Sequence, residues 1–529
     1  MNTVTKASIP LFQNDFVLIL FLLVFSLSLY TFKLGDCPFF NPDEGIHAQV
    51  AKNMVVDGDW ITPRFNGSNF YDKPILYYWL NALSFKLFGV NEFAARFPAA
   101  ILGSLGVILT YLLGKALYDK WTGFLAALIL SISFQYIFLS RLVVHDISLM
   151  FGIILSLFFF YHGFLQNKNR TWVIPFFYIS LAWSVLAKGP LGLVLPGMII
   201  GPYILLRKEW RLLKEMQLGL GIIIFLPLVA TWYVPVSLIN KDFLSYFIFH
   251  QHLQQFLSAE ESNHNASVFY YIPAFFGGLF PWSFFVPYAW FRTMSPLKKL
   301  LTRKEDLFLL LWFTVPLIFF SIARSKLTTY ILPVYPAASI MAARIWKDSI
   351  INVSARTKAM LYPLLALIII LVPAFIYLLL YYPSYWYIGL LLITGTALAF
   401  YCSFQNRAIF SFALLTATSA LTFLAVIIFV MPCYIHIFST RDLAGYLKQV
   451  SSPSDQVADY NRIANSTVFY SDRQVKLIRG RDNLLEYMNQ QGRWYLMIDE
   501  KQYVKNKDEI TKQSKFIYRE GNRLLLTNK

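Results

Sequence analysis

Long apolar runs follow one another along most of this chain, and they constrain its fold more than any other feature. Only 14% of the residues are charged, whereas soluble domains carry about 25%. An α-helix needs about 20 predominantly apolar residues to cross a bilayer. The sequence therefore predicts an α-helical polytopic membrane protein with about 13 transmembrane helices. The predicted spans lie near residues 15–33, 98–117, 122–140, 147–166, 171–187, 189–206, 217–235, 268–291, 306–322, 327–345, 359–381, 385–403 and 408–431.

The positive charge of the chain, +17 overall, lies mainly in short loops between the apolar runs. Alternate loops are basic, and the positive-inside rule places such loops in the cytoplasm. The other loops, 34–97, 141–146, 236–267 and 323–326, then lie on the outer face together with the tail after the last span. This distribution accounts for the charge without a nucleic-acid partner. The basic positions are Lys115, Lys120, Lys168, Arg170, 207–214, 298–304, 344–358 and Arg407.

Two domains are expected. Residues 1–431 form the transmembrane domain, with a first outer loop at 34–97 that carries amphipathic helices. The first apolar run lacks a basic start and a small-residue cleavage site, so we expect a retained anchor. Residues 432–529 alternate helix-like "STRDLAGYLKQV" and "NLLEYMNQQ" with strand-like "QVADY", "TVFYSD", "VKLIRG" and "RWYLMID", which indicates a small α/β domain. Three cysteines give no disulfide framework.

The first outer loop opens on "NPDEGIHAQVAKNMVVDGDW". Asn41 suits a helix cap, Pro42 the first helical position, and Glu44 the acidic position of a capping box. Gly58 ends this helix, whose apolar spacing predicts that it lies on the membrane surface. Asp43 falls in the first turn, where the helix dipole favours a carboxylate. It is either a catalytic group or only a complement to the dipole.

Two further outer segments carry charged residues at helix starts. In "FYDKPILYYW", Asp72 and Lys73 precede a proline, and the compact ammonium of Lys73 suits a phosphate contact. In "SRLVVHDISLM", Asp146 stands at the outer end of a span, where an ionisable residue indicates function. The alternatives are an ordinary Asp–Lys pair in the first segment and a structural Arg141–Asp146 ion pair in the second.

The last two outer segments offer histidines and cations. "FHQHLQQFLSAEESNHN" includes His250, and its histidines and carboxylates are the ligand types that divalent metals accept, although the spacing fits no standard zinc motif. A solvated loop is the alternative. In "ARSKLTTYILPVYPA", Arg324 and Lys326 have no acidic neighbour in sequence. They are either membrane anchors or contacts to a lipid phosphate.

Acids, cations and histidines from five segments thus share one face of the predicted bundle. This set suits a lipid-linked anionic substrate, with acids for chemistry and bases for the phosphate. The sequence contains no Gly-rich phosphate loop and no serine or cysteine nucleophile elbow. No nucleotide cofactor is therefore expected.

The motifs of residues 35–340 resemble those of bacterial lipid A aminoarabinose transferases and related protein O-mannosyltransferases, the C-type polyprenyl-phosphate-sugar glycosyltransferases. The resemblance rests on the acidic pair, "GDW", "DKP" and "YYW", followed in order by "YFIFHQHLQQF", "YYIPAFFGGLFPW" and "SKLTTYILPVYP". It implies thirteen spans, an outer soluble domain, and sugar transfer at the periplasmic face of the inner membrane. The implied partners are a polyprenyl-phosphate-linked donor, membrane lipids, and a lipid A, protein or glycan acceptor.

The resemblance also implies roles for particular residues. Asp43 and Asp146 match the catalytic acids, and Lys73 matches the lysine that holds the carrier phosphate. Asp72 and His250 fall where some members bind a divalent metal. Two positions depart from the family pattern: Asp72 stands where a glutamate is usual, and Gln255 stands where many members have a phosphate-binding arginine. We expect Lys326 or Arg324 to compensate for the lost arginine.

Lipid A is the acceptor that we expect, and a protein hydroxyl or another surface glycan is the alternative within the same reaction class. A transporter would place ionisable residues near the bilayer midplane and usually show repeats, neither of which this sequence has. A polymerase or ligase of lipid-linked glycans shares the donor, but we would not expect it to carry the "DKP" and "SKLTTYILP" segments.

Overall fold

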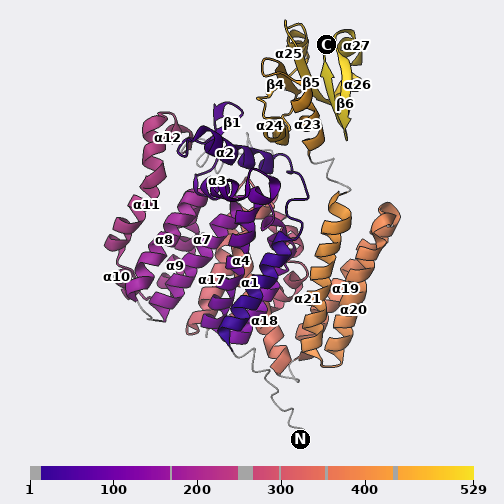
Figure 1. Ribbon diagram of the computed structural model, residues 1–529. Coiled ribbons are helices and arrows are strands. Elements are labelled where there is room, and N and C mark those ends of the chain that lie inside the picture. Colours follow the sequence, from indigo (N-terminus) through magenta and orange to yellow (C-terminus); the bar gives the residue numbers. More distant parts are fainter. Residues whose placement is uncertain are drawn as a thin grey trace.

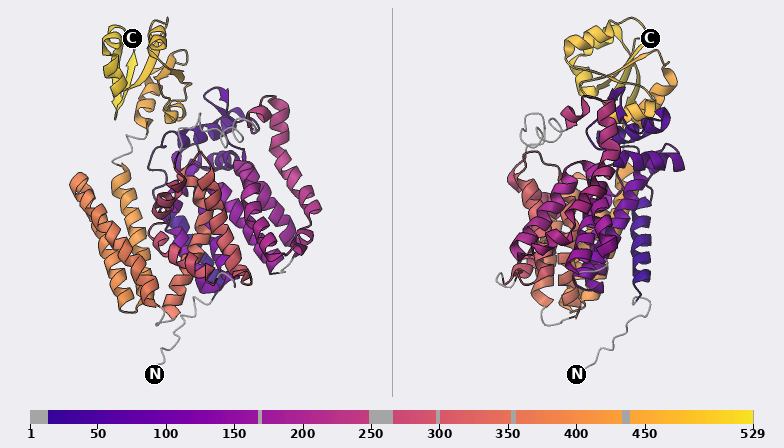
Figure 2. Two further views of the ribbon diagram at one scale, coloured as in Figure 1. Left: turned by 180° about the vertical axis from the view of Figure 1, so that it is seen from behind. Right: turned by 90° about the vertical axis from the view of Figure 1, so that its left-hand side faces the viewer.

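A bundle of apolar helices makes up most of the molecule, and a small domain built around a β-sheet stands over one end of it (Figure 1). The computed structural model describes residues 14–166, 170–247, 266–296, 300–351, 356–432 and 439–528. Figure 2 shows the same arrangement from two further sides, with the first outer loop between the bundle and the small domain.

Eight helices among these residues are long and apolar enough to cross a membrane. A ninth candidate is a pair, Val268–Gly278 and Trp282–Met294, that is bent by 114° at the break between them. Three apolar helices are shorter: α1 (Asp15–Thr31), α5 (Lys120–Ser131) and α9 (Leu191–Arg207). The eight long spans are Glu92–Leu117 (α4), Asp146–Leu165 (α7 and η2), Thr171–Lys188 (within α8, Arg170–Lys188), Leu218–Ile239 (α11), Lys304–Ile322 (α17), Ala359–Tyr381 (within α19, Arg356–Tyr381), Pro383–Phe404 (η7 and α20) and Ala408–Val430 (α21 and η8).

Three of the predicted spans are interrupted rather than continuous. The run 122–140 breaks after α5 and resumes as α6 (Phe134–Leu139). The run 268–291 bends where Pro281, which has no N–H to donate, separates α14 (Tyr271–Gly278) from η5 (Trp282–Phe285) and α15 (Val286–Met294). The run 327–345 begins as a 3₁₀-helix, η6 (Thr328–Val334), before α18 (Tyr335–Ile351).

Small residues bring helices close together in the bundle. Gly114 in α4 faces Gly123 in α5, and a Cβ at Gly114 would lie 2.7 Å from the Cα of Gly123. Lipid tails are as apolar as leucine, so close van der Waals packing of this kind holds membrane helices together.

The first outer loop folds into α2 (Asp43–Asp57), a hairpin of β1 (Arg64–Phe65) and β2 (Ser68–Asn69), and α3 (Leu76–Phe88). Gly58 ends α2 with φ of +73°, as expected from the sequence. The predicted cap is wrong, because Asn41 makes no cap bond and instead pairs with Ser466 of the small domain. Helix α2 packs between α3 and α24 (Asn465–Ser471), so these two helices cover two of its sides.

The small domain has five strands in the order β4-β3-β5-β7-β6. Strand β3 lies parallel to β4 and β5, and β7 lies antiparallel to β5 and β6. Apolar residues on both faces of the sheet form two separate core clusters. The elements are α23 (Arg441–Val450), β3 (Gln456–Tyr460), α24, β4 (Lys476–Ile478), α25 (Arg481–Met488), β5 (Trp494–Asp499), α26 (Glu500–Lys505), α27 (Lys507–Gln513), β6 (Lys515–Glu520) and β7 (Arg523–Thr527).

One strand prediction in this domain is wrong. The segment "TVFYSD" forms helix α24 instead, although valine and aromatic residues favour strands. The helix packs against α2 and α23, and the hydroxyls of Ser466 and Thr467 both bond to Thr440 at 2.9 and 2.7 Å. Tertiary packing has overridden the local preference.

Candidate active site

Four charged residues meet at the end of the bundle that lies beneath the small domain. Asp43 is the first residue of α2, Lys73 precedes α3, Asp146 is the first residue of α7 (Asp146–Phe159), and Lys188 is the last residue of α8. The charges of Asp43 and Asp146 both act on Lys73 and on Lys188. We call this set the Asp–Lys cluster. It unites three residues that the sequence singled out with one that it did not.

Asp146 and Lys188 form the centre of the cluster. Lys188 Nζ donates to Asp146 Oδ1 at 2.6 Å, and both side chains are largely buried. The start of η6 completes their surroundings: Thr329 bonds to the carboxylate of Asp146, and the Lys188 ammonium lies over the ring of Tyr330 at 4.8 Å. The "SKLTTYILP" segment thus reaches the cluster through its threonine and tyrosine.

Arg141 does not pair with Asp146, which excludes the structural ion pair considered from the sequence. Its guanidinium donates instead to the carbonyl oxygens of Leu29 and Tyr30, at 3.1 and 2.8 Å, and lies over the ring of Phe423. Arg141 therefore ties the end of α1 to the chain before α7 and leaves Asp146 to Lys188.

Lys73 lies in a half-buried position where its charge is disfavoured. Burial is the main cause that lowers its pKa from the ordinary lysine value, and the neighbouring charge of Lys188 lowers it further. Asp72, Asp146 and Asp43 act in the opposite direction. Two ammonium groups held close together make a site that an anion would stabilise. Asp72 itself accepts a hydrogen bond from the hydroxyl of Tyr246 at 2.9 Å.

Two histidines lie beside the cluster. His47 Nδ1 is 3.0 Å from the hydroxyl of Tyr78, and the His47 and His145 rings are 4.5 Å apart. Burial lowers the pKa of His47 to about 3 and lowers that of His145 as well, so both rings are neutral near pH 7. Neither ring nitrogen of His145 has a hydrogen-bond partner within the part of the chain that the structure describes.

The second acid of the pair Asp43–Glu44 has a structural role. Glu44 is buried and forms a bidentate ion pair with Arg96 of α4, with N–O distances of 2.7 and 2.8 Å. It also accepts the backbone N–H of Val143 at 2.9 Å. Glu44 thereby fixes the start of α2 to the bundle, which sets the position of Asp43.

The predicted phosphate contacts Arg324 and Lys326 stand in the loop before η6. Arg324 is exposed, whereas Lys326 is buried and donates to the carbonyl oxygens of Ala323 and, at 3.1 Å, Ala266. Among the described residues, no contact joins either side chain to the Asp–Lys cluster.

Only one of the two predicted metal ligands lies among the described residues. Asp72 is described, whereas His250 and Gln255 lie outside the described residues, with the rest of "FHQHLQQFLSAEESNHN". Among the described residues, no group of three or more histidine, cysteine, aspartate or glutamate side chains is placed to hold a metal ion.

Sequence reasoning missed Lys188. In "LAKGPLG" it is a lone cation between two apolar runs, and Gly-Pro follows it. Because the run before it begins at the basic loop that holds Arg170, alternation places Lys188 at the outer end of its span. A single cation at the outer end of an apolar span indicates a functional residue, and this pattern could have identified Lys188.

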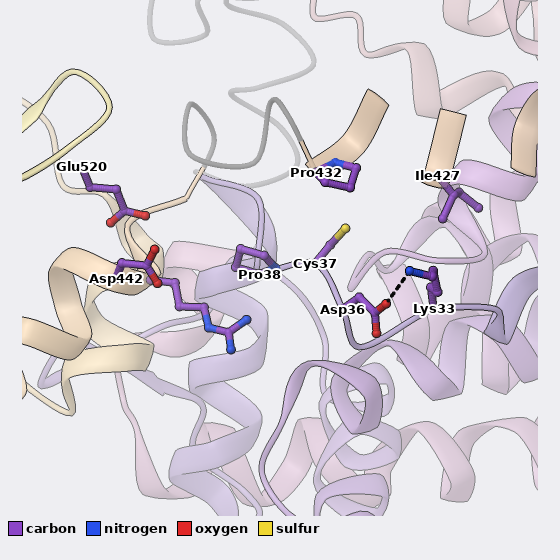
Figure 3. A pocket seen from close by; sticks show the side chains of 9 residues that line it. Lys33, Asp36, Cys37, Pro38, Ile427, Pro432, Asp442 and Glu520 are labelled. Carbon is purple, nitrogen blue, oxygen red and sulfur yellow. Dashed lines mark ion pairs between the residues drawn. The ribbon is translucent and has the colours of Figure 1, made fainter. Parts of the chain in front are cut away.

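A small hollow separates the first outer loop from the small domain (Figure 3). Cys37 and Pro38 line it on one side, and Asp442 and Glu520 of the small domain line it on the other. Burial raises the pKa of the Cys37 thiol, which keeps it protonated and unreactive near pH 7. The hollow is a junction between the two parts of the chain.

Comparisons with known proteins agree with this geometry. Residues 72–234 match the family described as dolichyl-phosphate-mannose-protein mannosyltransferase. The chain is 33% identical over 356 residues to the undecaprenyl phosphate-alpha-4-amino-4-deoxy-L-arabinose arabinosyl transferase of Aeromonas hydrophila, a match that covers 64% of this chain and 60% of that relative. An uncharacterized protein of Aquifex aeolicus is 34% identical over 326 residues, or 61% of this chain and 63% of that protein. The chain thus matches less than two thirds of the length of these relatives.

Solved structures match over nearly the whole chain. The crystal structure of ArnT from Cupriavidus metallidurans bound to undecaprenyl phosphate superposes with a TM-score of 0.82 at 20% identity, covering 98% of this chain and 99% of that one. An oligosaccharyltransferase of Archaeoglobus fulgidus gives a TM-score of 0.54 at 13% identity, covering 92% of this chain and 70% of that one. The chain is therefore a multi-pass membrane protein with the ArnT fold, and the resemblance found in its sequence is confirmed.

Proposed function

We propose that this protein is a glycosyltransferase that moves a sugar from a polyprenyl-phosphate carrier to lipid A, in an aminoarabinose-type transfer. The observation that carries the proposal is the Asp–Lys cluster. Two carboxylates and two ammonium groups from four separate segments meet at one end of an apolar bundle. A polyprenyl phosphate has the matching chemistry, an apolar chain with an anionic head. The name of the Aeromonas relative and the ArnT fold support the same donor.

Lys73 and Lys188 stabilise the carrier phosphate as it leaves. The bond between the anomeric carbon and the phosphate oxygen breaks with its electrons on the oxygen, so cations can neutralise the leaving group without an acid. Arg324 and Lys326 contact the same phosphate from the loop before η6. Lys326 keeps one of its three N–H groups for this purpose, because two bond to carbonyl oxygens.

Asp43 and Asp146 act on the sugar and the acceptor. The anomeric carbon passes through an oxocarbenium-like state, which the Asp146 carboxylate stabilises. An acceptor phosphate oxygen is already ionised and forms the new bond without a base, so Asp43 then orients the donor sugar. A hydroxyl acceptor would give its proton to Asp43. A single displacement inverts the configuration at the anomeric carbon.

A divalent cation would be held by Asp72 and His250, where it would add positive charge near the phosphate. The described residues supply only Asp72, whose carboxylate accepts a hydrogen bond from Tyr246. No step of the mechanism depends on a metal.

A protein hydroxyl is the second acceptor to test. The protein mannosyltransferase profile matches residues 72–234, which include Lys73, Asp146 and Lys188. These residues serve the donor, so they suit either acceptor. The acceptor alone distinguishes the two activities.

We propose thirteen spans in the inner membrane, with the cluster and residues 432–529 in the periplasm and residues 1–431 forming the transmembrane domain. Ion pairs support this orientation, because they join basic loops to one another away from the cluster. Lys347 pairs with Asp119 at 2.7 Å, and Arg344 pairs with Asp306 at 2.8 Å. Such basic loops belong on the cytoplasmic side.

Reconstitution of the purified chain in liposomes tests the activity. With a polyprenyl-phosphate-linked aminoarabinose and lipid A, the wild type should transfer sugar, and Asp43→Asn should reduce the rate at least about 100-fold, the scale of one general-base or charge-stabilising group. Asp57→Asn, an exposed residue at the far end of the same helix, is the matched control and should keep the wild-type rate. Near-normal transfer by Asp43→Asn would remove Asp43 from the mechanism.

A further inference from the structure

An open cavity of about 700 Å³ lies between the small domain and the start of α2. Its walls come from residues 439–440, 462–464, 499–502 and 522–523 of the small domain and from Asn41 and Pro42 of the first outer loop. Pro42 immediately precedes Asp43. The wall of the cavity therefore ends one residue before Asp43 of the Asp–Lys cluster, and the small domain supplies most of the lining.

The position of the cavity in the sheet favours ligand binding. Strand β3 connects through α24 to β4 on one side, and β4 connects through α25 to β5 on the other side of β3. The strand order thus reverses between the parallel strands β3 and β5. In open α/β sheets, ligands bind at the carboxyl ends of the strands where the order reverses. Residues 462–464 follow β3 and residues 499–502 begin at the end of β5, so the cavity occupies this place.

Most of the charges that line the cavity are neutralised within the domain. Arg523 is buried and pairs with Asp459 at 2.8 Å and with Asp499 at 3.3 Å. Glu500 pairs with Arg519 at 2.8 Å.

Two cations in the cavity wall remain. Arg462 and Lys501 are exposed, and within the described ranges neither side chain takes part in an ion pair or hydrogen bond. Arg462 lies in the loop after β3, and Lys501 lies in the first turn of α26, directly after β5. Because Arg523 offsets only one of its two carboxylate partners, these two cations leave the cavity wall with a net positive charge. The amide side chains of Gln502 and Asn522 add polar groups suited to hydroxyl or amine substituents.

We propose that this cavity binds the phosphorylated sugar headgroup of the acceptor, with Arg462 and Lys501 on its phosphate. A guanidinium and an ammonium together bind a phosphate through charge-assisted hydrogen bonds. Because Asn41 and Pro42 form the wall next to Asp43, a headgroup held here presents its neighbouring groups toward the Asp–Lys cluster. The proposal rests on the proposed function and adds the site at which the acceptor is recognised.

Equilibrium binding to the detergent-solubilised full chain tests the site without any transfer. The probes are glucosamine 1-phosphate, glucosamine and inorganic phosphate. We expect glucosamine 1-phosphate to bind best, and the double variant Arg462→Gln/Lys501→Gln to bind it at least about tenfold more weakly. The matched control is Lys476→Gln/Lys515→Gln, which removes two exposed cations at the opposite, amino edge of the parallel strands and should bind like the wild type.

Other outcomes contradict the proposal in distinguishable ways. Equal binding of inorganic phosphate and glucosamine 1-phosphate would make the cavity a site for free anions. If the double variant and the control bind glucosamine 1-phosphate equally, or if the wild type does not bind it, the proposed site is contradicted.

Transfer kinetics separate this proposal from the proposed function. The double variant should raise the KM for lipid A while the kcat and the KM for the donor stay near the wild-type values. A wild type that transfers no sugar to lipid A would contradict the proposed function. An active wild type with an unchanged KM in the double variant would contradict only the acceptor site.

Discussion

At the scale of residues, the placement of charges decides what the Asp–Lys cluster can bind. Lys73 and Lys188 stand near each other with two carboxylates, so the cluster holds cations whose charge a phosphate would stabilise. Sequence patterns identified Asp43, Lys73 and Asp146, because each stands at a helix start in an outer segment. They did not identify the partner of Asp146, since Lys188 is 42 residues away and meets it only through the packing of α7 against α8.

The lowered pKa of Lys73 predicts how transfer depends on pH. Lysine binds phosphate only when protonated, so activity should fall as pH rises through this pKa, at a lower pH than the ordinary lysine value of about 10.4. Asp72→Asn removes a carboxylate that raises this pKa, while an amide oxygen can still accept from Tyr246. Its alkaline limb should therefore move to lower pH in a pH–rate profile. For Asp57→Asn we expect no change in the alkaline limb. If the alkaline limb of Asp72→Asn also stays in place, Lys73 is not the group whose titration limits activity.

The buried pair Lys188–Asp146 permits a test that separates stability from chemistry. Lys188→Met leaves an unpaired buried carboxylate and should destabilise the chain by about 3–5 kcal/mol. In Lys188→Met/Asp146→Leu both charges are gone, so thermal stability in detergent should largely return. Transfer should stay at least about 100-fold below the wild-type rate, because the phosphate and oxocarbenium contacts are lost. Recovery of both stability and transfer would show that the pair is only structural.

At the scale of elements, helix α2 connects the Asp–Lys cluster with the small domain. Its start is fixed to the bundle by Glu44, and its upper side lies against α24. The approach is close at Gly45, where a Cβ would lie 2.6 Å from the backbone nitrogen of Ser466. The sequence predicted the helix and its end at Gly58 but not this contact, since α24 is some 420 residues further along the chain.

Gly45→Ala should therefore force α2 and α24 apart. We expect a loss of about 1–3 kcal/mol of stability, typical of overpacking, together with a raised KM for the acceptor. Gly445→Ala is the matched control: it lies in helix α23, a Cβ there meets nothing within 4 Å, and alanine is the better helix former. Thermal unfolding of the two variants in the same detergent makes the comparison. Equal melting temperatures would contradict the tight α2–α24 contact.

At the scale of the whole molecule, apolar length and loop charge predicted a helical membrane bundle with its polar residues gathered at one end. Bends in the bundle were not predicted, because hydropathy does not distinguish the 114° break before Pro281 from a tolerated proline such as Pro316 inside α17. Helix α23 and strand β3 followed from their sequence patterns, whereas α24 did not, because this helix depends on packing against α2 and α23. Local signals thus predicted elements, and long-range packing determined the site.

The measurement that tests the central claim most directly is mass spectrometry of lipid A and of periplasmic protein from cells that express the wild type, Asp43→Asn or no copy of the gene. The account predicts a sugar-sized mass on lipid A phosphates in the wild type alone, with peptide masses unchanged. A sugar that appears on peptides instead would make the protein a protein glycosyltransferase. Lipid A that is identical in all three strains would contradict transfer to lipid A.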